Sequence, residues 1–299
     1  MKSLKVDLAK SIFRFEYAMK KRFLIKNIFY ERVFRGKGLE FDGFRPYNYC
    51  DDASLIDWKA TMKLNSPLVR QYVEERDLKI LFIIDVGDNM VFGSGDKLKN
   101  ELSAEISASL GHLLISLGDT IGFVLYSDKI KQMRLFSKGM RQFYIFQNSL
   151  LNPENYGEAS NLKNVLKTVA HYLKKVSSVF IISDFINLED SEEELKKFIT
   201  RFETIGIMVR DPIDLELPDL KKEVIIEDPQ TGRQMLINPG VIRYQYKKYA
   251  MEQKKKVEKL FKDKNSDLID IYTNEDFVKP LSEFLKSRIK SRRYIMPKR

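Results

Sequence analysis

Two short apolar runs that each end in an aspartate constrain the fold of this chain more than any other feature. They are Lys79–Asp85 (KILFIID) and Ser178–Asp184 (SVFIISD). Unbroken β-branched and aromatic stretches of this length are typical of strands buried on both faces, as in a parallel sheet. Parallel strands point the same way, so Asp85 and Asp184 are expected at one carboxyl edge, where open α/β folds bind ligands. Two carboxylates there suggest a cation, a charged partner or a pair of helix caps.

From Leu78 onward the sequence alternates between strand-like and helix-like segments. Further strands are predicted at 120–126, 130–136, 204–210 and 267–272, and a hairpin at 224–238. Apolar stripes predict helices over 97–117, 141–150, 162–174, 192–201, 243–262 and 275–288. This alternation predicts an α/β fold, with a mostly parallel sheet and helices on both of its faces.

The first 74 residues have a different character. A helical stripe is formed by Leu4, Leu8, Ile12, Phe15, Met19 and Phe23. The stripe predicts an amphipathic helix, docked on the domain or lying on a membrane surface. Residues 34–73 are aromatic-rich and broken by glycine and proline, which suggests a small β-rich extension or arm. We therefore predict an N-terminal part at 1–74, an α/β domain at 75–290 with a hairpin insertion at about 211–240, and a basic tail at 291–299.

Composition and charge narrow the class of protein. Charged residues make up 31% and apolar residues 43% of the chain, and no stretch approaches the ~18 apolar residues of a membrane span. The N-terminus lacks the apolar core of a signal peptide, and the single Cys50 excludes an internal disulfide, so we expect a cytoplasmic protein. The net charge of +10 gathers at the ends: residues 1–38 carry eleven basic and three acidic residues, and 286–299 carry seven basic and none acidic. Such ends are either solvated or contact nucleic acid or anionic lipid.

Several ordered blocks together resemble a known family. They are Gly36–Phe41, Arg45–Tyr47, Asp51 with Asp52, Ile56–Trp58, Asp85–Met90, Ser183–Phe185, Val209–Pro212 and Leu217 with Pro218. The chain resembles the von Willebrand factor A fold, and more closely the bacterial and archaeal domain-of-unknown-function family 58, which is often found beside MoxR-type ATPases. The resemblance extends over nearly the whole chain.

The resemblance implies a metal-ion-dependent adhesion site at the carboxyl edge. In the family pattern, hydroxyls ligate Mg²⁺, two aspartates hold its waters, and an acidic side chain of a partner completes the shell. The corresponding residues here are Asp85, Asn89, Ser160 and Asp184, while Gly87 replaces the first serine and offers no ligand. The alternative is that Asp85 and Asp184 cap helices or accept hydrogen bonds from loop N–H groups.

A second block precedes the α/β region. It contains Arg45, Asp51, Asp52, Asp57 and Trp58. The three aspartates could form a catalytic acid cluster, but no histidine or cysteine that could activate them lies nearby in sequence. We instead expect a structural role for the block, with Trp58 buried.

Three functions remain open from the sequence. The first is a non-enzymatic interaction module that works with a MoxR-type AAA+ ATPase in assembly or maturation of a client, as the resemblance implies. The second is a metal-dependent hydrolase that uses the same aspartates. The third is binding of nucleic acid or an anionic membrane through the basic termini.

Overall fold

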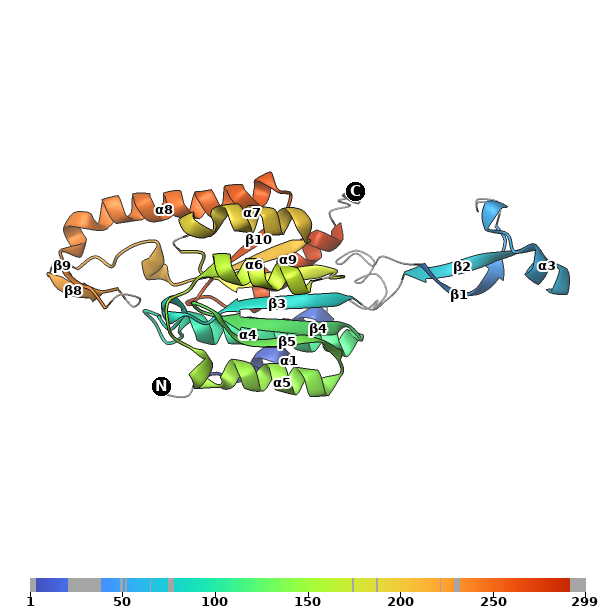
Figure 1. Ribbon diagram of the computed structural model, residues 1–299, viewed down its shortest axis with the longest axis horizontal. Helices are drawn as coiled ribbons and strands as arrows, with labels where there is room; N and C mark the ends of the chain where they lie inside the picture. The colour runs from blue at the N-terminus through green and yellow to red at the C-terminus, as the bar shows by residue number, and fades with distance from the viewer. Residues whose placement is uncertain are drawn as a thin grey trace.

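The body of the protein is a six-stranded sheet between two layers of helices (Figure 1). The computed structural model describes residues 4–20, 39–48, 51, 53–64, 66–74, 78–173, 175–186, 188–220, 222–228 and 232–290. The strands of this sheet are β3 (Lys79–Asp85), β4 (Thr120–Tyr126), β5 (Ile130–Lys138), β6 (Ser178–Ser183), β7 (Thr204–Arg210) and β10 (Asp267–Tyr272). All six were expected from the sequence within two residues at either end, because their apolar runs are unbroken and bounded by polar residues.

The strand order positions the candidate site. The order is β10-β7-β6-β3-β4-β5, with β5 antiparallel to β4 and all other neighbours parallel. The predicted mostly parallel sheet is thus confirmed. The direction of strand addition reverses between β3 and β6, and in such sheets the carboxyl edge at the reversal forms a crevice. Asp85 ends β3 and Asp184 follows β6, so the two aspartates flank this point.

Helices cover both faces of the sheet, as predicted. One face packs against α1 (Leu8–Lys20), α4 (Lys99–Leu117), α5 (Met140–Leu151) and α9 (Val278–Lys290). The other face packs against α6 (Leu162–Tyr172), α7 (Glu192–Arg201) and α8 (Pro239–Asp263). The short 3₁₀ helices η1 (Ala53–Leu55), η2 (Asp88–Met90), η3 (Pro153–Asn155), η4 (Glu189–Ser191) and η5 (Pro212–Asp214) lie in the connections. None of the described helices combines the length and apolar character that a membrane span requires.

The N-terminal helix α1 is docked on the body. Its side chains Leu8, Phe15 and Met19 are buried in the same core as α4, whereas Phe13 and Tyr17 face solvent. The docked interpretation of the amphipathic stripe is therefore the one that the structure supports. Phe23, the last position of the stripe, lies outside the described residues.

Two small antiparallel pairs of strands lie outside the main sheet. The arm, which we define as residues 39–74, pairs β1 (Leu39–Pro46) with β2 (Leu68–Glu74), and carries α3 (Trp58–Leu64) between them. Figure 1 shows the arm standing away from the body, at the end opposite the hairpin of β8 (Val224–Glu227) and β9 (Gln234–Ile237). The predicted hairpin is confirmed, and α3 is a helix within a segment that was expected to be β-rich.

The docking of α1 is open to a direct test. Phe15→Ala removes a fully buried ring and should lower the free energy of unfolding by about 3–4 kcal/mol. Phe13→Ala on the same helix removes an exposed ring and should change it by less than about 0.5 kcal/mol. Urea denaturation of both variants measures the difference, and equal losses would contradict the docked position of α1.

Candidate functional site

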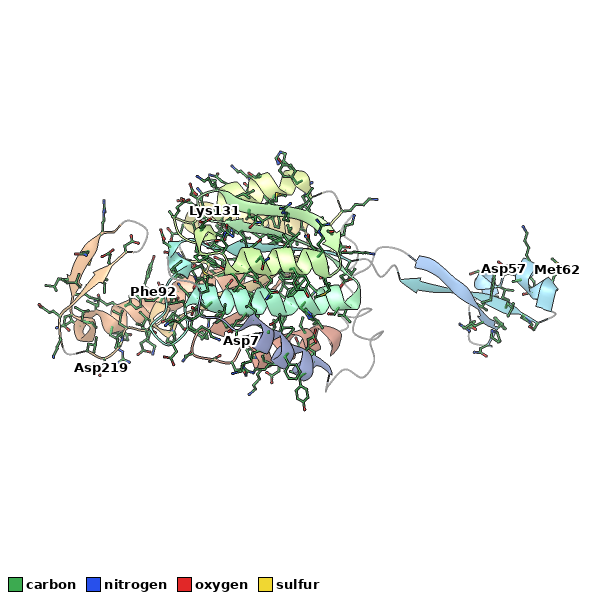
Figure 2. The ribbon with its side chains drawn as sticks, turned by 90° about the horizontal axis from the view of Figure 1, so that it is seen from below. Asp7, Asp57, Met62, Phe92, Lys131 and Asp219 are labelled. Carbon is green, nitrogen blue, oxygen red and sulfur yellow. The ribbon has the colours of Figure 1, made fainter. Side chains whose placement is uncertain are left out.

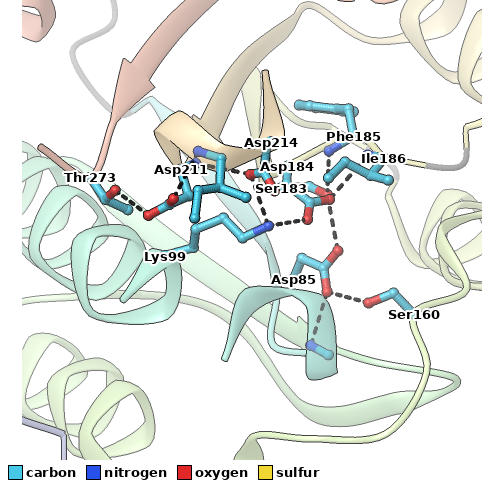
Figure 3. A network of polar contacts seen from close by, with 12 residues as sticks. Asp85, Lys99, Ser160, Ser183, Asp184, Phe185, Ile186, Asp211, Asp214 and Thr273 are labelled. Atoms are coloured by element: carbon cyan, nitrogen blue, oxygen red, sulfur yellow. Dashed lines mark hydrogen bonds and ion pairs between the residues drawn. The ribbon is translucent and has the colours of Figure 1, made fainter. Parts of the chain in front are cut away.

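Asp85 is enclosed at the end of β3. Its side chain accepts hydrogen bonds from the Gly87 backbone N–H (3.0 Å) and the Ser160 hydroxyl at Oδ1, and from the Ser183 hydroxyl (2.9 Å) at Oδ2 (Figure 3). The Tyr126 hydroxyl lies 3.4 Å from Oδ2. Only 3% of Asp85 is exposed, so both carboxylate oxygens are occupied by groups of the protein itself.

Enclosure changes the acidity of this carboxyl group. Burial and, to a smaller extent, the negative charge of Asp184 raise the pKa of Asp85 to about 6, although the hydrogen-bond donors act to lower it. The carboxyl group therefore takes up a proton at a pH where an exposed aspartate stays ionised.

A buried lysine neutralises the second aspartate. Lys99, the first residue of α4, donates from Nζ to Asp184 Oδ2 (2.8 Å) and to Asp214 Oδ2 (3.1 Å). Its side chain is only 2% exposed. Burial lowers the pKa of Lys99, but the two carboxylates raise it more, so the pKa stays above its ordinary value and the ammonium is charged.

Asp211 fastens the neighbouring loops. It accepts hydrogen bonds from the Ser94 backbone N–H (2.9 Å) and hydroxyl (2.6 Å) and from the Thr273 hydroxyl (2.7 Å). It also caps η5 by accepting from the Ile213 N–H (3.0 Å), and its own N–H donates to Asp214 (2.9 Å). The loop after β3, the end of β7 and the end of β10 are therefore held together beside the Lys99 ion pairs.

A second buried cation, Arg210, ends β7. Its side chain is almost fully enclosed, and its Nε and Nη2 atoms meet no hydrogen-bond acceptor within the part of the chain that the structure describes. Buried donors of this kind are usually satisfied by ordered water. With Lys99, this arginine brings two positive charges to the carboxyl edge.

The structure brings some of the predicted metal ligands together and leaves others apart. Ser160 contacts Asp85 directly, and Asp184 lies beside them with Ser183 between (Figure 3). Asp184 also accepts a hydrogen bond from the Ile186 N–H (3.0 Å), so both aspartates bind loop N–H groups, as the alternative interpretation expected. Asn89 lies in η2, and its side chain makes no hydrogen bond to another described residue.

The glycine at position 87 has a steric role. A Cβ atom there would lie 2.2 Å from Ser160 Oγ, far inside contact distance. The absence of the first serine therefore makes room for Ser160 to reach Asp85.

The arrangement does not fit a divalent metal ion. Mg²⁺ needs about six oxygens in near-octahedral geometry. Here Asp184 is paired with the ammonium of Lys99, and Asp85 is bonded at both oxygens. Among the described residues, no group of three or more His, Cys, Asp or Glu side chains is arranged to hold a metal.

Sequence reasoning missed Lys99, Asp211 and Asp214. Asp211 belongs to a family-like block without an expected role, and Lys99 looks like a solvated residue at a helix start. The available signal was a lysine in the first turn of a helix whose other residues are mostly apolar or small. A cation there opposes the helix dipole, and this points to a compensating carboxylate.

The second predicted block lies in the arm, and Figure 2 shows its Asp57 away from the body of the protein. Arg45 forms a two-pronged ion pair with Asp51 (2.5 and 2.6 Å), which lowers the pKa of Asp51 to about 2. Asp57 accepts hydrogen bonds from the N–H groups of Lys59 and Ala60 (2.9 and 3.0 Å) and so begins α3. The expected burial of Trp58 is wrong: it is 66% exposed, and none of the described residues of the arm belongs to the hydrophobic cores of the body. Asp52 lies outside the described residues.

Comparison with known proteins identifies the family. A family model described as "Protein of unknown function DUF58" matches residues 43–256. The chain belongs to this family. The DUF58 match runs from the arm through β3, β4, β5, β6 and β7 into α8, and so includes both predicted blocks.

Named relatives and solved structures are distant. The chain is 25% identical over 261 residues to the "Uncharacterized protein Rv1480" of Mycobacterium tuberculosis, covering 85% of this chain and 80% of the relative, with the same values for "Uncharacterized protein Mb1516" of Mycobacterium bovis. BatB from Bacteroides thetaiotaomicron has a TM-score of 0.45 at 11% identity, over 72% of this chain and 100% of that one. An aerotolerance-related membrane protein from Bacteroides fragilis has a TM-score of 0.44 at 12% identity, over 71% and 98%.

The raised pKa of Asp85 predicts a pH dependence of stability. The folded state holds this proton more tightly than the unfolded state, so its contribution is full below about pH 4 and is lost as the pH rises through about 6. Asp85→Asn removes the titration. Between about pH 4 and 7 the variant should therefore gain stability relative to the wild type, on the order of 3 kcal/mol.

Urea denaturation across this pH range measures the effect. The control is Asp96→Asn, an exposed aspartate in the loop that leads to α4. If Asp85→Asn and the wild type lose stability in parallel, Asp85 does not have the raised pKa.

Proposed function

We propose that this DUF58 chain is a non-catalytic protein-binding module whose contact surface lies at the carboxyl-edge end of the body. The observation that supports this most is the composition of the β8–β9 hairpin. Ile225 is opposite Leu236 on one face of the hairpin, and Ile226 is opposite Met235 on the other. All four side chains are exposed, so neither face is covered by the part of the chain that the structure describes. A two-stranded hairpin that is apolar on both faces is expected to be covered by a partner.

The exposed apolar surface continues onto α8. Val241 and Tyr244, in the first turns of this helix, are both more than 70% exposed. Figure 1 shows the hairpin at the end of the body where the loops after the parallel strands emerge, and Figure 2 shows Phe92 of the β3 loop at the same end. Aromatic and long apolar side chains are enriched in the cores of protein interfaces.

The base of this surface is rigid. The second half of α8 is buried against the sheet through Val257, Leu260 and Phe261. Its first half is tied to the loop after β7, since Lys247 pairs with Glu216 (2.5 Å) and the Tyr246 hydroxyl donates to the Ile213 carbonyl (3.0 Å). A fixed base lowers the entropy lost when a partner binds.

Beside this base lies an open hollow of about 460 Å³, lined in part by Leu217, Arg243 and Tyr272. The hollow lies at the carboxyl ends of β7 and β10. A partner that covers the hairpin would also meet it.

A hydrolase that uses the same aspartates has less support. The observation in its favour is the raised pKa of Asp85, since catalytic acids are often tuned in this way. Asp85 and Asp184 are, however, 3% and 2% exposed, and their oxygens are bonded within the protein. A substrate would need direct access to a group that acts as general acid or base.

The resemblance of the sequence suggests the partner. In this proposal the body is a von Willebrand factor A-like frame, supported by its strand order with a single antiparallel edge strand, and it works with a MoxR-type AAA+ ATPase or the client of that ATPase. Most of the basic termini, including residues 291–299, lie outside the described residues, and the proposal does not depend on them.

Charge insertion on each face of the hairpin tests the proposal. Ile225→Asp and Met235→Asp should each weaken binding to a purified MoxR-type ATPase from the same organism about thirtyfold, because a buried charge would replace an apolar contact. The control is Leu135→Asp, an equally exposed leucine on the edge strand β5. Biolayer interferometry measures binding, and circular dichroism checks the fold. Equal affinities for all three variants would refute the proposed surface.

A further inference from the structure

We infer that the ammonium of Lys99 is the cation that pairs with the carboxylates of this edge, and that it takes the place of a divalent metal ion. Lys99 Nζ lies 2.8 Å from Asp184 and 3.1 Å from Asp214, beside the point where the order of the strands reverses. The inference concerns the charge balance of the edge and does not rest on the proposed partner.

The burial of the three charges supports this role. An ammonium that is only 2% exposed is very costly unless carboxylates and hydrogen bonds compensate it. Asp184 and Asp214 are also shielded from water, with side chains 2% and 10% exposed. Each charge is therefore retained because the other two are present.

The position of Lys99 in its helix argues against an accidental contact. It is the first residue of α4, where the partial positive charge of the helix end disfavours a cation. The helix start is held by Glu101, which accepts a hydrogen bond from the Leu98 N–H (3.0 Å), and by the ion pair of Lys97 with Glu105 (2.6 Å). The stem of Lys99 therefore begins from a fixed point and reaches across to β6 and η5.

The other oxygens of Asp85 and Asp184 are already bonded. Asp184 Oδ1 accepts from the Ile186 N–H, and Asp85 accepts from Gly87, Ser160 and Ser183. Ser160 can approach Asp85 only because position 87 has no side chain. Glycine at 87 and lysine at 99 thus belong to one arrangement, in which protein donors replace the ion and its ligands.

Metal titration of two proteins tests the inference. In the wild type, Mn²⁺ should show no saturable binding by electron paramagnetic resonance and no rise of Tm. Lys99→Ala frees Asp184 and Asp214, and should gain Mn²⁺ binding with a Tm rise of about 2–4 °C at a tenfold excess over Kd. Saturable Mn²⁺ binding by the wild type that Asp184→Asn abolishes would overturn the inference. So would a folded Lys99→Ala that binds no Mn²⁺.

If the alanine variant fails to fold, a single and a double variant test the inference through stability instead. Lys99→Met should lower Tm by about 10 °C, because two buried carboxylates lose their partner. Adding Asp184→Asn should recover at least half of that loss, since one of those charges is then removed. If the double variant is no more stable than Lys99→Met, or if it does not fold, Lys99 is not the balancing cation.

Discussion

The ion pairs of Lys99 with Asp184 and Asp214 are the interaction on which the rest of the carboxyl edge depends. They join the first turn of α4 to the end of β6 and to η5, three elements that are far apart in the sequence. The sheet beneath is almost wholly apolar, so Asp184 and Asp214 would be strongly disfavoured as buried carboxylates without the ammonium. Asp211 extends the same network to the loop after β3 and to β10, which joins the loops of this edge into one hydrogen-bonded unit.

The residues that could take part in catalysis and the residues that could bind a partner lie in different environments. The aspartates that would serve a metal ion or a hydrolytic step are sealed inside the edge, whereas the apolar residues of the β8–β9 hairpin are exposed beside it. The buried ion pairs hold the loops of the edge in place, and the exposed hairpin forms the proposed contact surface. The arm lies at the other end of the molecule (Figure 1), where the ion pair of Arg45 with Asp51 shapes its loop and Trp58 is exposed.

The sequence predicts the sheet well and the site only in part. Runs such as Thr204–Arg210 are buried on both faces, so their composition alone defines a strand. The convergence of Asp85 and Asp184 follows from parallel direction. The pairing of Lys99 with two aspartates could not be predicted in this way, because its partners lie 85 and 115 residues away and no local pattern encodes it. Trp58 was expected in a core but is exposed, because burial depends on neighbouring elements that the sequence composition does not reveal.

The most direct measurement of the central claim is nuclear magnetic resonance of the lysine side-chain ammonium groups in the wild-type protein. The account predicts one ammonium signal that is protected from exchange with water, persists above neutral pH, and disappears in Lys99→Met. Protection follows from burial and from two charged hydrogen-bond acceptors. If every ammonium exchanges rapidly, or if the protected signal survives in Lys99→Met, Lys99 is not the buried cation of this edge.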